Sequence, residues 1–124
     1  MMAKLMTVLL AAECLENGTW MLDTPLTASD SVRDTKGAVI WLVPGETMSV
    51  EDLLKGVIIG NANDAAAVLA EGVSGSIDRF VQDMNARAFD LGMRDTVFTS
   101  PQGYADPVQQ TSAYDLALLC RALQ

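Results

Sequence analysis

The sequence predicts a mainly helical domain with one small β element. Apolar residues recur at the spacing of an α-helix in five stretches, and serine or glycine marks most of their ends. One segment, residues 19–47, instead holds two short runs of β-type residues separated by turn-forming ones. At 124 residues the chain has the length of one domain, which we place over residues 1–124.

The first predicted helix spans residues 2–16 and is apolar on nearly every side, which is typical of a helix in the centre of a core. Asn17–Gly18 ends it, because glycine readily adopts the left-handed conformation of a helix C-cap. The two β-type runs that follow are Thr19–Leu22 and Val39–Val43. We therefore expect a small hairpin or a pair of short strands within residues 19–47.

Four more helices are predicted after the β element. A serine stands where it can cap three of them, at Ser49, Ser76 and Ser112. The remaining helix, residues 64–72, is rich in alanine and can therefore pack closely against its neighbours. Residues 93–110 contain proline and glycine at turn spacing, so we expect an ordered loop there.

The composition excludes several classes of function. A formal net charge of −8 repels phosphate backbones, so we expect no nucleic-acid partner. The chain has no histidine, which removes histidine-based catalytic triads and most zinc sites. We expect no metal and no cofactor, and any nucleophilic mechanism would need a lysine as its base.

The N-terminal residues allow two interpretations. Lys4 followed by the apolar run Leu5–Ala12 could pass for a weak signal peptide. The run is short and interrupted by Thr7, so we interpret it as part of a buried helix. No segment approaches the ~20 consecutive apolar residues of a membrane span.

Individual cysteine and aromatic residues are expected to serve packing. We predict that Cys14 and Cys120 are reduced and largely buried, with a disulfide between the first and last helices as the alternative. Trp20 and Trp41 are interpreted as packing residues rather than a platform for a sugar ring. Tyr114 is interpreted as an anchor of the core or of a loop rather than a catalytic acid.

Three ordered stretches carry a resemblance to a known family. They are Lys4–Thr7 (KLMT), the segment Val43–Ala66 (with PGE, VEDLL and NANDAA) and the segment Leu91–Ala117 (with LGMRDT, SPQG and SAYDLA). In this order and spacing they resemble the low-molecular-weight penicillin-binding proteins that act as serine-type D-alanyl-D-alanine carboxypeptidases. The resemblance covers essentially the whole chain.

The resemblance implies a fold, a substrate and a location. The fold would be the helical subdomain of the β-lactamase/transpeptidase-like fold, with a small β-hairpin and with the main five-stranded sheet missing. The substrate partner would be the D-Ala-D-Ala peptide of peptidoglycan, and the location extracytoplasmic, although this chain shows no convincing signal peptide. Catalysis in the family uses three motifs, Ser-x-x-Lys, Ser-x-Asn and Lys-Thr-Gly.

The chain keeps only part of these motifs. Lys4 matches the lysine that takes the proton of the serine, and Asn63 matches the asparagine of the second motif. Met1 and Asn61 stand where the two serines should be, and the Lys-Thr-Gly motif would follow Gln124. We therefore expect a truncated or degenerate copy without hydrolytic activity. Lys4 as a merely solvated residue of the first helical turn is left open.

Two further hypotheses concern binding rather than catalysis. The chain could still recognise peptidoglycan stem peptides without cleaving them, or it could self-associate. The other helices alone are not expected to bury all the leucines of the first helix, which are Leu5, Leu9, Leu10 and Leu15. This predicts a homodimer or a higher oligomer whose interface includes residues 2–16 or 112–123.

Overall fold

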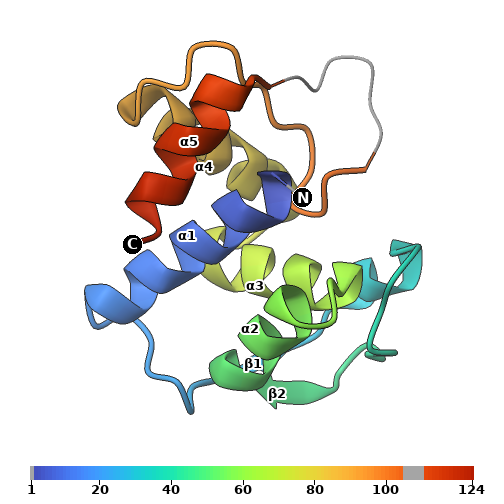
Figure 1. Ribbon diagram of the computed structural model, residues 1–124. Helices are drawn as coiled ribbons and strands as arrows, with labels where there is room; N and C mark the ends of the chain where they lie inside the picture. The colour runs from blue at the N-terminus through green and yellow to red at the C-terminus, as the bar shows by residue number, and fades with distance from the viewer. Residues whose placement is uncertain (1, 105–110) are drawn as a thin grey trace.

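The fold is mainly helical with one two-stranded sheet, as the sequence predicts (Figure 1). The computed structural model describes residues 2–104 and 111–124. The elements in chain order are α1 (Met2–Glu16), β1 (Pro25–Thr27), the 3₁₀-helix η1 (Asp30–Asp34), β2 (Thr47–Ser49), α2 (Val50–Ile58), α3 (Asn63–Ser74), α4 (Ile77–Asp90) and α5 (Ala113–Ala122). Within the described residues no helix is both long enough and apolar enough to cross a membrane.

Helix α1 runs through the middle of the molecule and contacts each of the other four α-helices (Figure 1). This position explains its apolar character on every side. Leu9 and Leu10 are buried, and Leu5 and Leu15 are half-buried. The expectation that the other helices do not bury all four leucines is therefore confirmed, because Leu5 and Leu15 stay partly exposed although α2, α3, α4 and α5 all contact α1.

The serine caps fix the starts of three helices. The side chains of Ser49, Ser76 and Ser112 each accept a hydrogen bond from the backbone N–H three residues ahead, at 3.1 to 3.2 Å. Helix α3 ends two residues beyond the predicted Gly72, with Gly75 in the left-handed conformation. Gly72 serves packing instead, since an added Cβ would lie 2.9 Å from Leu26 Cδ1.

The β element lies only partly within the predicted residues 19–47, since β2 continues to Ser49, and the two predicted runs are not strands. The strands are β1 and β2, paired antiparallel with Leu26 opposite Met48. Trp20 is instead buried in the core, and the backbone N–H groups of Ile40 and Leu42 bond to the carboxylate of Asp64 rather than to a neighbouring strand. The first run places Trp20 in the core, and the second forms a loop around Trp41. β-Propensity alone does not distinguish these roles from that of a strand.

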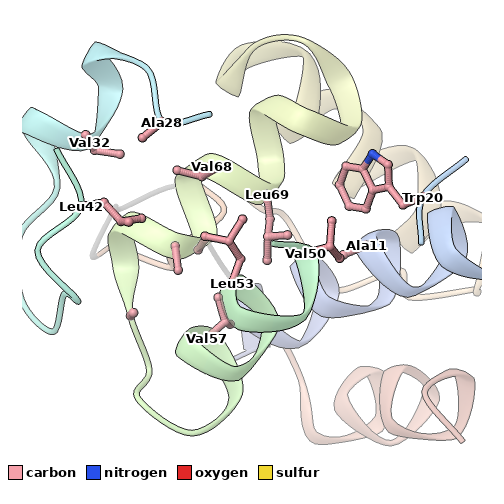
Figure 2. Close-up of a cluster of buried hydrophobic side chains, with 13 residues drawn as sticks. Ala11, Trp20, Ala28, Val32, Leu42, Val50, Leu53, Val57, Val68 and Leu69 are labelled. Carbon is pink, nitrogen blue, oxygen red and sulfur yellow. The ribbon is translucent and has the colours of Figure 1, made fainter. Parts of the chain in front are cut away.

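Buried side chains form two clusters on either side of α1 and α3. Figure 2 shows the first cluster, in which Val50 and Leu53 of α2 lie beside Leu69 of α3. The second cluster contains Phe80 and Met84 of α4. The alanines of α3 are almost wholly buried, which confirms that this helix packs closely against its neighbours.

The last helix is less buried than its sequence suggests. In α5 the apolar side chain of Leu119 is fully buried, while Cys120 is exposed and Tyr114 projects into solvent. Cys14 is half-buried and both cysteines are free thiols, so the predicted burial is wrong for Cys120. The predicted packing of Tyr114 is also wrong, because this residue of α5 is 70% exposed.

The predicted loop after α4 is ordered over its described part. Met93 and Phe98 are buried, and the side chain of Asn85 bonds to both the N–H and the carbonyl group of Phe98. Residues 105–110 of the predicted loop lie outside the described residues. The ordered part brings Pro101 and Gln102 against the start of α1.

Candidate functional site

Lys4 is buried near the start of α1. The residue is only 8% exposed, so the interpretation of Lys4 as a solvated residue is wrong. Its Nζ donates a hydrogen bond of 3.1 Å to the carbonyl oxygen of Gln102. Burial removes water from the ammonium group and lowers the pKa of Lys4 below its ordinary value. Among the described residues, no carboxylate forms an ion pair with Lys4.

Thr7 holds the loop that supplies the partner of Lys4. Its hydroxyl oxygen lies 2.9 Å from the carbonyl oxygen of Pro101 and 3.0 Å from that of Ala3, one turn earlier in α1. Both Thr7 and Pro101 are fully buried. The carbonyl group of Gln102 is therefore fixed in front of Lys4 by the neighbouring residue.

Asn63 begins α3 and is bonded on three of its polar groups. Its backbone N–H donates to Ala38 O at 2.7 Å, and its side-chain Nδ2 donates to the carbonyl oxygen of Lys36. Its carbonyl oxygen accepts a bond of 3.3 Å from Gln102 Nε2. The side-chain Oδ1 is buried and has no hydrogen-bond partner within residues 2–104 and 111–124. This oxygen is an acceptor that the described residues leave free.

Gln102 connects Lys4 and Asn63, the two residues that the sequence alone matches to the family motifs. Its backbone carbonyl accepts from Lys4 and its side chain donates to the backbone of Asn63, so α1 and α3 meet through this one loop residue. Sequence reasoning gave Gln102 no role. The SPQG stretch that carries part of the resemblance was the signal that could have pointed to it.

Asn61 lies beside Lys4 on an apolar groove. The groove has a volume of about 610 Å³ and is lined by Lys4, Leu5, Val8, Val57, Ile58, Ile59, Asn61 and Leu123. Asn61 occupies the turn between α2 and α3 with a positive φ of 54°, a conformation that asparagine tolerates better than most residues. The structure thus brings Lys4 and Asn61 to one groove, joins Asn63 to them through Gln102, and does not describe Met1.

The lining of the groove limits its chemistry. Lys4 is the one titratable side chain among the described lining residues, and none of these residues carries a hydroxyl or a thiol. Asn61 and Lys4 can form hydrogen bonds with a ligand, and the remaining residues offer apolar contact. An amine that is partly desolvated can act as a base or as a nucleophile.

Asp64, next to Asn63, fixes the loop beside the site. Its buried carboxylate accepts hydrogen bonds from the N–H groups of Ile40 at 3.0 Å, Leu42 at 2.9 Å and Ala65 at 2.9 Å. Trp41 lies between Ile40 and Leu42, whose amides bond to Asp64. It has a φ of 63° and is 83% exposed. Packing is therefore confirmed for Trp20 and wrong for Trp41, whose backbone is held in a conformation that L-residues disfavour.

Replacing Trp41 by glycine is expected to stabilise the chain by about 0.5–1 kcal/mol. Glycine adopts positive φ without steric cost, and the exposed indole contributes little burial. Urea unfolding of the parent and of Trp41→Gly measures the difference. Trp41→Ala is the matched control, because it removes the indole and keeps the strain, so it should give no gain. Equal stability of the alanine and glycine variants would contradict the account.

The whole chain matches the family model described as D-alanyl-D-alanine carboxypeptidase, over residues 1–124. It is 38% identical over 122 residues to the D-alanyl-D-alanine carboxypeptidase DacF of Bacillus subtilis, an alignment that covers 98% of this chain and 31% of DacF. The chain therefore spans about a third of the length of this curated relative.

Solved structures share the fold. The D-alanyl-D-alanine carboxypeptidase DacD from Francisella tularensis superposes with a TM-score of 0.94 at 33% identity, over 98% of this chain and 29% of that one. Penicillin-binding protein 6B from Escherichia coli gives a TM-score of 0.92 at 33% identity, over 98% of this chain and 40% of the other. The prediction of a helical region of the β-lactamase-like fold is thereby confirmed. Matched over its full length, the chain belongs to the D-alanyl-D-alanine carboxypeptidase family.

Proposed function

We propose that this chain is a degenerate member of the family that does not hydrolyse peptides ending in D-Ala-D-Ala. The observation that carries the proposal is the identity of the residues at the two serine positions, Met1 and Asn61. Acyl transfer in this chemistry begins with attack by a serine hydroxyl, and neither a thioether nor a carboxamide can form the same ester. Lys4 and Asn63 remain. The chain therefore keeps two groups that would assist a catalytic serine, but not the serine itself.

The lining of the groove supports this proposal. No hydroxyl or thiol group lines it among the described residues, so no other side chain there is placed to take over as the acylated nucleophile. The family's substrate also suggests the place of action, and we include in the proposal that the chain works outside the cytoplasmic membrane, where peptidoglycan lies.

Release of D-alanine tests the proposal directly. The chain is incubated with a synthetic peptide ending in D-Ala-D-Ala, and free D-alanine is measured with D-amino-acid oxidase. A full-length family member that carries both motif serines is the positive control. We expect no release above that of peptide alone. Release that scales with the concentration of the chain would overturn the proposal.

Non-catalytic recognition of the stem peptide is a second candidate function. The free Oδ1 of Asn63 favours it, because a buried acceptor without a partner costs about 1–3 kcal/mol and a peptide N–H could satisfy it. Calorimetric titration with peptides ending in D-Ala-D-Ala and in L-Ala-L-Ala measures this recognition. Binding confined to the D-Ala-D-Ala peptide is expected, and identical heats for the two peptides would contradict it.

Self-association is proposed for the apolar rim of the groove. Ile58 and Ile59 are 65% and 81% exposed there, and covering them with a second copy would remove apolar surface from water. The proposed interface combines the end of α2 with Leu5, Val8 and Leu123 of the same groove, which belong to the segments 2–16 and 112–123 expected from the sequence. Light scattering over a concentration series should show a dimer or larger species. A monomer at high micromolar concentration would contradict this proposal.

A further inference from the structure

The amine of Lys4 has hydrogen-bonding and nucleophilic capacity that the proposed function does not use. An ammonium group carries three N–H donors, and Nζ forms one hydrogen bond within the described residues, to Gln102 O. Buried amines are normally paired with carboxylates, and Lys4 forms no ion pair with any residue that the structure describes. The groove on which the side chain opens is lined by aliphatic residues from three separate segments of the chain, Leu5 and Val8, Val57 to Ile59, and Leu123.

We propose that Lys4 is a nucleophile that captures uncharged, apolar aldehydes as an imine in this groove. The proposal rests on three features found together: a buried amine, no acidic partner for it within residues 2–104 and 111–124, and an adjoining apolar groove of about 610 Å³. That volume lies within the range of pockets that bind small molecules. The proposal does not depend on hydrolytic silence, since imine formation requires no serine.

The chemical step balances without any further reactant. The neutral amine of Lys4 adds its lone pair to the aldehyde carbon, and one proton passes from the nitrogen to the carbonyl oxygen to give a carbinolamine. Loss of water then forms the C=N bond, so one aldehyde and one amine give one imine and one water molecule. When protonated, the imine retains a single N–H, which is the number needed to keep the bond to Gln102 O.

The surroundings favour the reactive form of the amine and an apolar partner. Only the neutral amine attacks a carbonyl group, and the desolvation that lowers the pKa of Lys4 increases its neutral fraction at pH 7. No Asp, Glu, Arg or second Lys side chain lines the described part of the groove, so nothing there would hold a charged group of the ligand. The aliphatic lining selects instead for hydrocarbon substituents.

Reductive trapping tests the proposal on the whole chain. The protein is treated with benzaldehyde and sodium cyanoborohydride at pH 7, and each lysine is quantified by fragment mass spectrometry, which also separates Lys4 from the terminal amine. Lys36 and Lys55 are exposed and serve as internal controls. We expect Lys4 to be benzylated several-fold faster than either, and this preference to disappear in concentrated urea. Equal labelling of the three lysines in the folded chain would overturn the proposal.

Two further measurements separate the groove from general amine reactivity. Lys4→Arg should abolish the preferred adduct, and Lys55→Arg should leave it unchanged. With the unaltered chain, glyoxylate should lose the preference for Lys4, because its carboxylate would have to enter the aliphatic groove. Faster labelling of Lys4 by glyoxylate than by benzaldehyde, relative to Lys55, would contradict the apolar selectivity.

Discussion

The chain with serine restored at positions 1 and 61 is expected to release no D-alanine from a D-Ala-D-Ala peptide. Loss of a serine nucleophile alone costs about 10⁶ in turnover in a well-studied hydrolase, so a working site would be easily detected once the serines returned. What the restored chain would still lack is a cationic group in the groove that could bind the substrate carboxylate. Lys4 is the one cation among the described groove residues, and it would be needed as the base.

The assay for this prediction compares three variants with the parent. They are Asn61→Ser alone, serine at position 1 behind an added initiator methionine, and the two changes combined. Circular dichroism confirms that each variant is folded. D-Alanine release by the doubly changed chain would show that 124 residues suffice for catalysis, and the account of the groove would then be wrong.

Replacing Asp64 by alanine is expected to destabilise the fold by about 3 kcal/mol. The carboxylate is 2% exposed and accepts bonds from three backbone N–H groups, those of Ile40, Leu42 and Ala65. Removing it leaves the amides of Ile40 and Leu42 without their acceptor, at a cost of about 1–3 kcal/mol for each amide that stays buried. Urea unfolding monitored by circular dichroism measures the change.

A matched control separates the role of Asp64 from the loss of a charge. Asp52 also lies in the first turn of a helix, α2, but it is exposed. Asp52→Ala should change stability by no more than about 0.5 kcal/mol. Asp64→Asn keeps one acceptor and should fall between the two alanine variants. Similar stability of Asp64→Ala and Asp52→Ala would show that the hydrogen bonds from the loop to Asp64 contribute nothing to the free energy of unfolding.

The helices could be predicted because their signals are local. The caps at Ser49, Ser76 and Ser112 involve residues three positions apart, and the apolar character of α1 follows from its central place. The strands could not be placed, because the extended run around Ile40 bonds to Asp64, which is 24 residues away. Sequence shows the β-type residues of that run but not their distant acceptor.

The candidate site was predicted unevenly for a similar reason. Lys4, Asn61 and Asn63 were found through the motif spacing of the family, and Lys4 and Asn61 indeed line one groove. Gln102 was missed because its bond to Lys4 uses a backbone carbonyl, a group that every residue has. Trp41 is exposed with a positive φ between two amides that bond to Asp64, and this arrangement cannot be derived from residue type.

The central claim is that this member of the family has lost its acylated nucleophile. Intact-mass spectrometry of the unaltered chain after incubation with penicillin tests it most directly, because the stable penicilloyl ester of a family serine would be seen as a single added mass. The account predicts an unchanged mass at concentrations that label a serine-bearing relative completely. Attachment of one penicilloyl group per chain to a single serine or threonine would contradict it, provided that protein unfolded before the incubation is not labelled.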